Sequence, residues 1–160
     1  MNKLNFWISA FTLLLILAAT AFYDYYAGLT LYLAVLLVIL GLGILIGVLN
    51  WYESRSKSAV VLLILFIAAL GILRFTALGP AKPFRQLYLS VKPGMERTVV
   101  KDNIAKYFPP QGRFSQPKIS EDVATEMVLI LDSVNPKYDS EGMVIKFTDN
   151  KVTSSQYFGD

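Results

Sequence analysis

The sequence has no cysteine and no histidine, and only 17% of its 160 residues are charged. Without cysteine, the chain can form no disulfide bond, has no thiol nucleophile and cannot be acylated at a lipobox. Without histidine it lacks the usual general base, and the absence of both residues removes the common zinc and haem ligands. We therefore expect no cofactor, no metal site and no enzymatic activity.

Apolar residues take the place of the missing charge. Hydrophobic residues make up 54% of the chain, and the mean hydropathy of +0.48 is typical of a membrane protein. Four of the 15 basic residues and two of the 12 acidic residues precede Pro80, so the charges after it nearly balance. Such a tail has no basic stripe to neutralise phosphates, and nucleic acid is not an expected partner.

Three long apolar runs fill the first half of the chain, at residues 6–22, 29–52 and 58–78. Each has about the 20 apolar residues that a helix needs to cross a hydrocarbon core. The first run could instead be the apolar region of a cleaved signal peptide, but such regions are shorter. The sequence therefore predicts a region of three transmembrane helices over residues 1–79, with the lipid bilayer as its surroundings.

The two loops between these runs differ in charge. The first loop carries Asp24 and no basic residue, whereas the second carries Arg55 and Lys57. The positive-inside rule then places the N-terminus and the second loop in the cytoplasm and the C-terminal domain outside it. Arg74, near the far end of the third run, argues for the opposite orientation. We expect the inner (cytoplasmic) membrane of a bacterium, or a comparable membrane.

Gly43 and Gly47 in the second run have the four-residue spacing that lets two helices approach closely. They are candidates for helix packing and for a homo-oligomer formed through the transmembrane helices. The alternative is that glycine is simply frequent in membrane helices. No Asp, Glu or Lys interrupts the middle of a run, which disfavours a proton relay or ion pathway.

The third run ends at a Gly-Pro pair with a second proline soon after it, and these residues disfavour continuation of the helix. Residues 80–84 are therefore predicted as a linker, and residues 85–160 as a soluble α+β domain. An amphipathic stripe over residues 95–108 predicts a helix in that domain. The prolines and glycine of residues 109–120 predict a loop.

Three strands are predicted after this loop, with the sequences TEMVLILDSV, GMVIKFT and KVTSSQYF. Asp149-Asn150 separates the last two and suits a tight hairpin turn. The first strand is apolar on both faces, which indicates a central strand or a strand covered on each side. The expected fold is thus three transmembrane α-helices followed by a small domain in which a helix packs on a three-stranded antiparallel sheet.

Two segments of the tail, VKPGMERTVVKDNIAKYF and GMVIKFTDNKVTSSQYF, resemble the SmpA/OmlA (BamE-like) family. Gly94-Met95 and the residues from Asp149 to Val152 carry the resemblance. This chain lacks the acylated cysteine of that family, and three apolar runs stand in place of the lipid anchor. The resemblance implies a protein-interaction scaffold of the bacterial envelope that has no catalytic centre.

Tyr107, Phe108 and Phe114 lie near the end of the predicted helix and are candidates for a partner-binding surface. They could instead close the core of the domain, and the sequence leaves both interpretations open. The oxygen-bearing residues of segment 135–141 could bind calcium, but they lack the spacing of an EF-hand loop. A solvated turn is the simpler interpretation of that segment.

Two functions fit these features. The first is a non-enzymatic integral membrane protein whose extracytoplasmic domain binds another membrane or envelope protein, in the assembly or stabilisation of a complex. The partner would contact an exposed edge of the sheet, where unpaired backbone groups accept an added strand, or the three aromatic residues. The second is a subunit of an oligomeric channel or transporter whose tail domain is regulatory.

Overall fold

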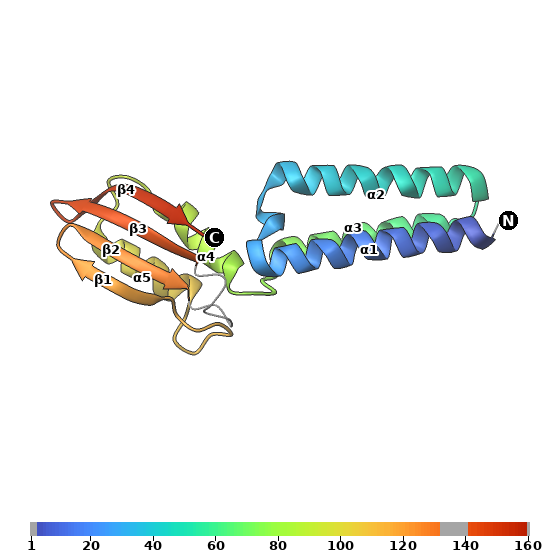
Figure 1. Ribbon diagram of the computed structural model, residues 1–160. Helices are drawn as coiled ribbons and strands as arrows, with labels where there is room; N and C mark the ends of the chain where they lie inside the picture. Colours follow the sequence, from blue (N-terminus) through green and yellow to red (C-terminus); the bar gives the residue numbers. More distant parts are fainter. Residues whose placement is uncertain (1–2, 132–140, 160) are drawn as a thin grey trace. The chain divides into compact units, whose positions relative to one another are not determined.

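The computed structural model describes residues 3–131 and 141–159. The chain forms two compact units, Met1–Leu78 and Gly79–Asp160. The first unit contains helices only, whereas the second combines two helices with a β-sheet (Figure 1).

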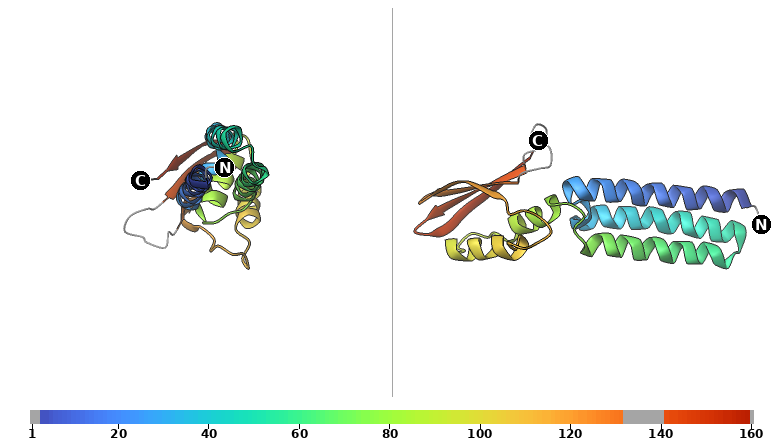
Figure 2. Two further views of the ribbon diagram at one scale, coloured as in Figure 1. Left: turned by 90° about the vertical axis from the view of Figure 1, so that its right-hand side faces the viewer. Right: turned by 90° about the horizontal axis from the view of Figure 1, so that it is seen from below.

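The first unit consists of α1 (Lys3–Ala27), the short 3-10 helix η1 (Leu29–Leu31), α2 (Leu33–Ser54) and α3 (Lys57–Phe75). The three long helices lie side by side, each antiparallel to the one before it (Figure 2). All three are long enough and apolar enough to cross a membrane. The helix α1 continues through residues 23–27, which belong to the predicted first loop between the apolar runs, and it ends where Gly28 adopts a left-handed φ of 55°.

Polar groups at one end of this unit bond to one another. The carboxylate Oδ1 of Asp24 accepts hydrogen bonds from the backbone N–H of Thr30 at 2.8 Å and from its hydroxyl at 2.6 Å. The guanidinium of Arg74 donates to the carbonyl oxygen of Thr30 at 2.6 Å. These bonds tie the connection between α1 and α2 to the end of α3.

The two glycines of the predicted packing motif face α3 of the same chain. A Cβ atom on Gly43 would lie 2.1 Å from Cε1 of Phe66, and one on Gly47 would lie 3.0 Å from Cδ1 of Leu63. Phe66 is only 2% exposed, so its ring fills the space that Gly43 leaves. The close approach that the spacing allows is therefore made within the chain, and this face of α2 is already occupied.

The second unit consists of α4 (Ala81–Ser90), α5 (Arg97–Tyr107), β1 (Lys118–Val123), β2 (Glu126–Leu131), β3 (Glu141–Thr148) and β4 (Lys151–Phe158). The strands form one antiparallel sheet in the order β1-β2-β3-β4, and both helices cover the same face of it (Figure 2). A continuous apolar core lies between the two layers. Its members are Ala81, Phe84, Leu87, Val91, Val100, Ile104, Phe108, Met127, Leu129, Leu131, Met143, Ile145, Phe147 and Val152.

The prediction of three strands is wrong, because a fourth strand, β1, forms within KISEDV. All six of its residues are exposed, and its pairing with β2 is interrupted by a register shift between Ile119 and Glu121. An edge strand of this kind buries little, so its sequence shows no apolar alternation. Tertiary pairing with β2, and not local pattern, makes this segment a strand.

The predicted linker over residues 80–84 instead forms the start of α4. Pro80 is the N-cap residue and Pro83 lies in the first turn, where backbone N–H groups have no intrahelical acceptor. The prolines therefore cost no hydrogen bond at these positions. Burial of Phe84 and Leu87 in the core stabilises the helix that these prolines begin.

The hairpin between β3 and β4 has the turn that the sequence predicts. Asp149 and Asn150 both adopt positive φ, at 50° and 64°, as a two-residue hairpin loop of type I′ requires. Gly94, in the turn before α5, also has a positive φ, of 85°. Each of these residue types tolerates the left-handed region better than most others do.

We predict that Gly43→Ala destabilises the first unit by about 1–3 kcal/mol, because the added methyl group overlaps the buried ring of Phe66. Gly41→Ala is the matched control, since a Cβ atom there meets nothing within 4 Å. Thermal unfolding of the full chain in mild detergent, followed by circular dichroism, measures both effects. Equal midpoints for the two variants would contradict the packing of α2 on α3.

Candidate protein-interaction surface

The three aromatic residues singled out in the sequence lie against the domain core. Phe108 caps α5 and is 0% exposed, so its ring is not available at the surface. Tyr107 and Phe114 are half-buried and pack against the same core. The structure therefore gives Phe108 the position that the core interpretation expected. The sequence alone could not decide between a partner-binding surface and a place in the core, because these residues belong to the apolar stripe of the helix and also lie near its end.

No cluster of three or more metal-binding side chains is found among residues 3–131 and 141–159. Of the candidate calcium segment, residues 135–140 lie outside the described residues. Glu141 is described, and its carboxylate pairs with Arg85 at 3.1 Å. That carboxylate is therefore engaged in an ion pair.

Arg85, Glu141 and Tyr157 form the first of two polar clusters in this unit. They come from α4, β3 and β4. The guanidinium of Arg85 donates to Oε1 of Glu141 at 3.1 Å and to the hydroxyl of Tyr157 at 3.2 Å. The ring of Tyr157 also packs against Phe84 and Tyr88, with centroids 6.2 Å and 5.3 Å away. The cluster therefore fixes α4 to the end of the sheet.

The phenol of Tyr157 is poorly placed for acid–base chemistry. Burial of its ring raises the pKa of Tyr157 above the ordinary value, and the nearby Glu141 carboxylate raises it further, while Arg85 opposes the change. A general acid or base works best with a pKa near the working pH. Tyr157 thus stays protonated at neutral pH and serves as a hydrogen-bonding group in the packing of α4.

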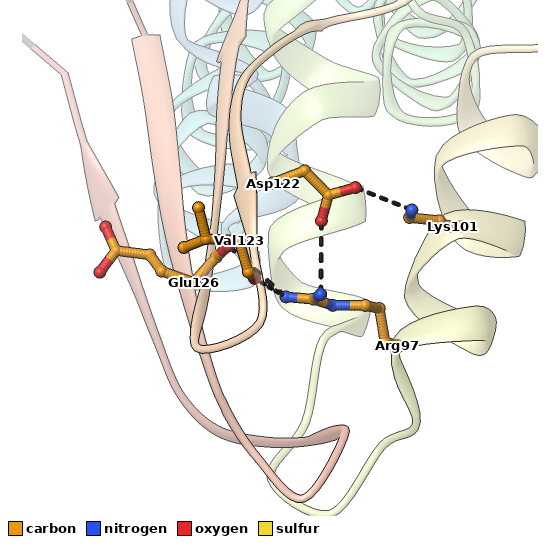
Figure 3. A network of polar contacts seen from close by, with 5 residues as sticks. All are labelled: Arg97, Lys101, Asp122, Val123 and Glu126. Atoms are coloured by element: carbon orange, nitrogen blue, oxygen red, sulfur yellow. Dashed lines mark hydrogen bonds and ion pairs between the residues drawn. The ribbon is translucent and has the colours of Figure 1, made fainter.

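Arg97 is the centre of the second polar cluster, which joins α5 to the β1–β2 hairpin (Figure 3). Its guanidinium donates to the carbonyl oxygens of Val123 and Glu126 and lies 3.6 Å from the Asp122 carboxylate. Lys101, one turn further along α5, bonds to the same carboxylate at 2.8 Å. This cluster orients the edge strand β1 against the helix.

Both polar clusters therefore hold helices to the sheet, and neither resembles a catalytic constellation. One further polar group is notable. The side chain of Asn50 in α2 is buried, at 3% exposed, and neither of its amide atoms has a hydrogen-bond partner among the described residues. An amide left unpaired in apolar surroundings costs about 1–3 kcal/mol. The sequence analysis missed Asn50, although it is a polar residue near the end of the second apolar run, residues 29–52.

The face of the sheet opposite the helices is the surface that the described elements leave uncovered. Met127, Leu129 and Leu131 of β2 point into the core, so Val128 and Ile130 point to the other face. Val144 lies directly opposite Val128 in the register. We call the apolar centre of this surface the open-face patch; it consists of Val128, Ile130, Val144 and Phe158.

The rim of the open-face patch is polar. Gly142 lies opposite both Ile130 and Phe158 in the register, and a Cβ atom there would lie 2.2 Å from Cζ of Phe158. The ring of Phe158 therefore lies over Gly142 and extends the patch across three strands. Lys146 and Glu126 lie opposite each other at its border. A small apolar centre with a charged border is typical of a protein-binding surface.

The sequence held a signal for this surface. The strand that became β2 is apolar at every position from Met127 to Leu131, which predicted either a central strand or a strand covered on each side. In the sheet, β2 is an inner strand. In the described residues, helices cover only one face. The other face therefore keeps a partly exposed apolar centre.

We predict that the tail domain of the full chain loses stability between about pH 9 and 12, and that Tyr157→Phe reduces this loss. Because the folded-state pKa of Tyr157 is raised, its contribution is complete below the unfolded pKa of about 10 and declines as the pH rises toward the folded pKa. Pulse proteolysis in graded urea measures the stability. Tyr52→Phe, a change at an exposed tyrosine of the first unit, is the control. Parallel pH profiles for wild type and Tyr157→Phe would contradict the cluster.

We also predict that Arg97→Met destabilises the tail domain by about 1.5–3 kcal/mol, the usual worth of hydrogen bonds to a charged group. Methionine keeps the apolar stem against Phe147 and loses the three contacts to the hairpin. Lys101→Met is the matched control, because its side chain is 49% exposed and a surface pair contributes about 0–1 kcal/mol. The same proteolysis assay compares them, and equal losses would show that Arg97 acts only as a surface charge.

No family model, no curated protein and no solved structure matches this chain. The resemblance to the SmpA/OmlA family therefore stays a prediction from residues 94–95 and 149–152.

Proposed function

We propose that this protein is a non-enzymatic integral membrane protein that presents a small protein-interaction domain. The three helices of the first unit anchor it, and the domain binds another membrane or envelope protein. The open-face patch is the contact surface, and the role is assembly or stabilisation of a membrane complex. The resemblance to the SmpA/OmlA family, whose members are interaction scaffolds, favours the same class of function.

One observation carries this proposal: β2 has two apolar faces, and the described helices cover only one of them. Burying the side chains of the second face removes apolar area from water, which is favourable by roughly 25 cal/mol per Å². The charged pair of Lys146 and Glu126 at the border offers partners of both signs. By contrast, the polar clusters around Arg85 and Arg97 hold the fold together and leave few charged groups for chemistry.

The orientation belongs to the proposal as well. Arg55 and Lys57 favour a cytoplasmic position for the connection between α2 and α3, which puts the domain on the extracytoplasmic side. Arg74 argues for the opposite orientation, but its guanidinium bonds to the Thr30 carbonyl within the helical unit. A charge held in this way is a weaker topological signal than charges at the connection between two helices.

The test places a photo-crosslinking residue at Val128 in the full chain, in the native membrane. We expect a discrete adduct with one membrane protein. Val144→Lys lowers its yield about tenfold or more, because an unpaired ammonium must be buried in the contact. Gln111→Lys adds the same charge in an exposed loop and is the control.

A crosslinker at Lys106, on the exposed side of α5, reports nonspecific encounters. Adducts of equal yield and identity at Val128 and Lys106 would refute the open-face patch as the contact surface, and so would a yield unaffected by Val144→Lys. Resistance of the tail domain to protease, measured in each variant, verifies that the fold is retained.

A further inference from the structure

The two edges of the sheet differ in how they are protected. The edge strand β1 carries Lys118, Glu121 and Asp122 among its six residues, and a register shift interrupts it. Charged side chains and bulges are the devices by which proteins prevent an edge strand from pairing with another chain. The β1 edge is therefore protected against further pairing.

The outer edge of β4 begins with a partner from its own chain. The backbone N–H of Gly94 donates to the carbonyl of Val152 at 2.8 Å, and the N–H of Val152 donates to the carbonyl of Met95 at 2.8 Å. Arg97 adds a backbone bond to Asn150 at 3.0 Å. A short stretch of chain before α5 thus already lies against this edge as a strand would, antiparallel to β4.

Beyond Val152 the same edge is open. The six residues from Thr153 to Phe158 include no charged side chain, and no described residue outside β3 supplies a backbone partner for them. Ser154 and Gln156 are exposed, and Phe158 is 39% exposed. The pairing of β4 with β3 also has a register shift, between Lys146 and Phe147, which leaves Thr153 as an extra residue at the start of this segment. From Ser154 onward the edge offers unpaired backbone groups and lacks the charges that protect β1, so an extended strand can add to it.

We propose that the open edge of β4 pairs antiparallel with the same edge of a second copy of this chain. The two four-stranded sheets then join into one continuous sheet, with the two open-face patches on the same side. The free segment from Thr153 to Phe158 defines the contact, because the chain before α5 occupies the edge up to Val152.

The charges of the two edges decide which of them can pair with a second copy of the chain. A two-fold axis that pairs a strand antiparallel with its own copy runs perpendicular to the sheet, so one residue lies opposite its own counterpart. An edge that carries charge would then face like charge, which is unfavourable. Glu121 and Asp122 create that problem on β1, whereas the segment of β4 is neutral and can face itself without repulsion.

The same symmetry fixes the register to two choices. Within Thr153–Phe158 the central residue on the axis is either Ser155 or Gln156. Residues that lie directly opposite in antiparallel strands have Cα atoms about 4.5–5.5 Å apart, which is within the range that a disulfide bridges. Because the chain has no cysteine, a single introduced cysteine reports this contact without background.

The test uses Ser155→Cys and Gln156→Cys in the full chain, in membranes and under mild oxidation. We expect a disulfide-linked dimer for one or both, at least about tenfold above the level of Glu121→Cys on the β1 edge, since only groups in the paired register lie within bonding distance. Gln156→Lys, combined with Ser155→Cys, lowers the dimer yield about twofold, because with Ser155 on the axis the two lysines are diagonal neighbours about 7–8 Å apart across the paired strands.

If neither Ser155→Cys nor Gln156→Cys gives more disulfide-linked dimer than Glu121→Cys does, the proposed pairing of two β4 edges is overturned. Linkage of Ser155→Cys to a different polypeptide would also overturn it and would identify a heterologous strand at this edge. The outcome is distinguishable from that of the proposed function, because we expect Val144→Lys to leave the Ser155→Cys dimer unchanged while it lowers the yield of the adduct formed from Val128 about tenfold or more.

Discussion

The apolar core between α4, α5 and one face of the sheet is the constraint on which the tail domain depends. Phe84, Leu87 and Phe108 supply the helix side of this core, and Met127 and Met143 belong to its sheet side. Because side chains alternate along a strand, committing one face of β2 and β3 to this core commits the other face to the outside. The position of the open-face patch is thus a consequence of core packing.

The polar clusters follow from the same arrangement. At two places where a helix meets the ends of the strands, one arginine side chain forms hydrogen bonds between the helix and the sheet. Arg85 joins α4 to the ends of β3 and β4, and Arg97 joins α5 to the β1–β2 hairpin. Arginine suits this position because its planar guanidinium donates in several directions while its stem packs on rings such as that of Phe147. Both residues are thus accounted for as packing elements.

In the first unit, the close packing of α2 on α3 uses the two glycines whose spacing predicted packing against a second copy. Phe66 and Leu63 occupy the positions beside Gly43 and Gly47. The chain therefore satisfies within itself the close approach that glycine spacing permits. The self-association proposed above uses the neutral edge of β4 instead.

The three apolar helices, the amphipathic helix α5 and the hairpin turn at Asp149-Asn150 could be predicted from the sequence, because each depends on local composition, periodicity or turn chemistry. The remaining features depend on contacts between distant segments of the chain. The proline-containing segment before Arg85 is helical because burial of Phe84 and Leu87 in the core stabilises α4. The segment KISEDV is a strand because β2 supplies its hydrogen-bond partners. Phe108 is buried because the sheet packs against the end of α5. One apolar face of β2 has no helix over it among the described residues, because the number of helices that cover a sheet depends on the whole domain and not on the sequence of one strand.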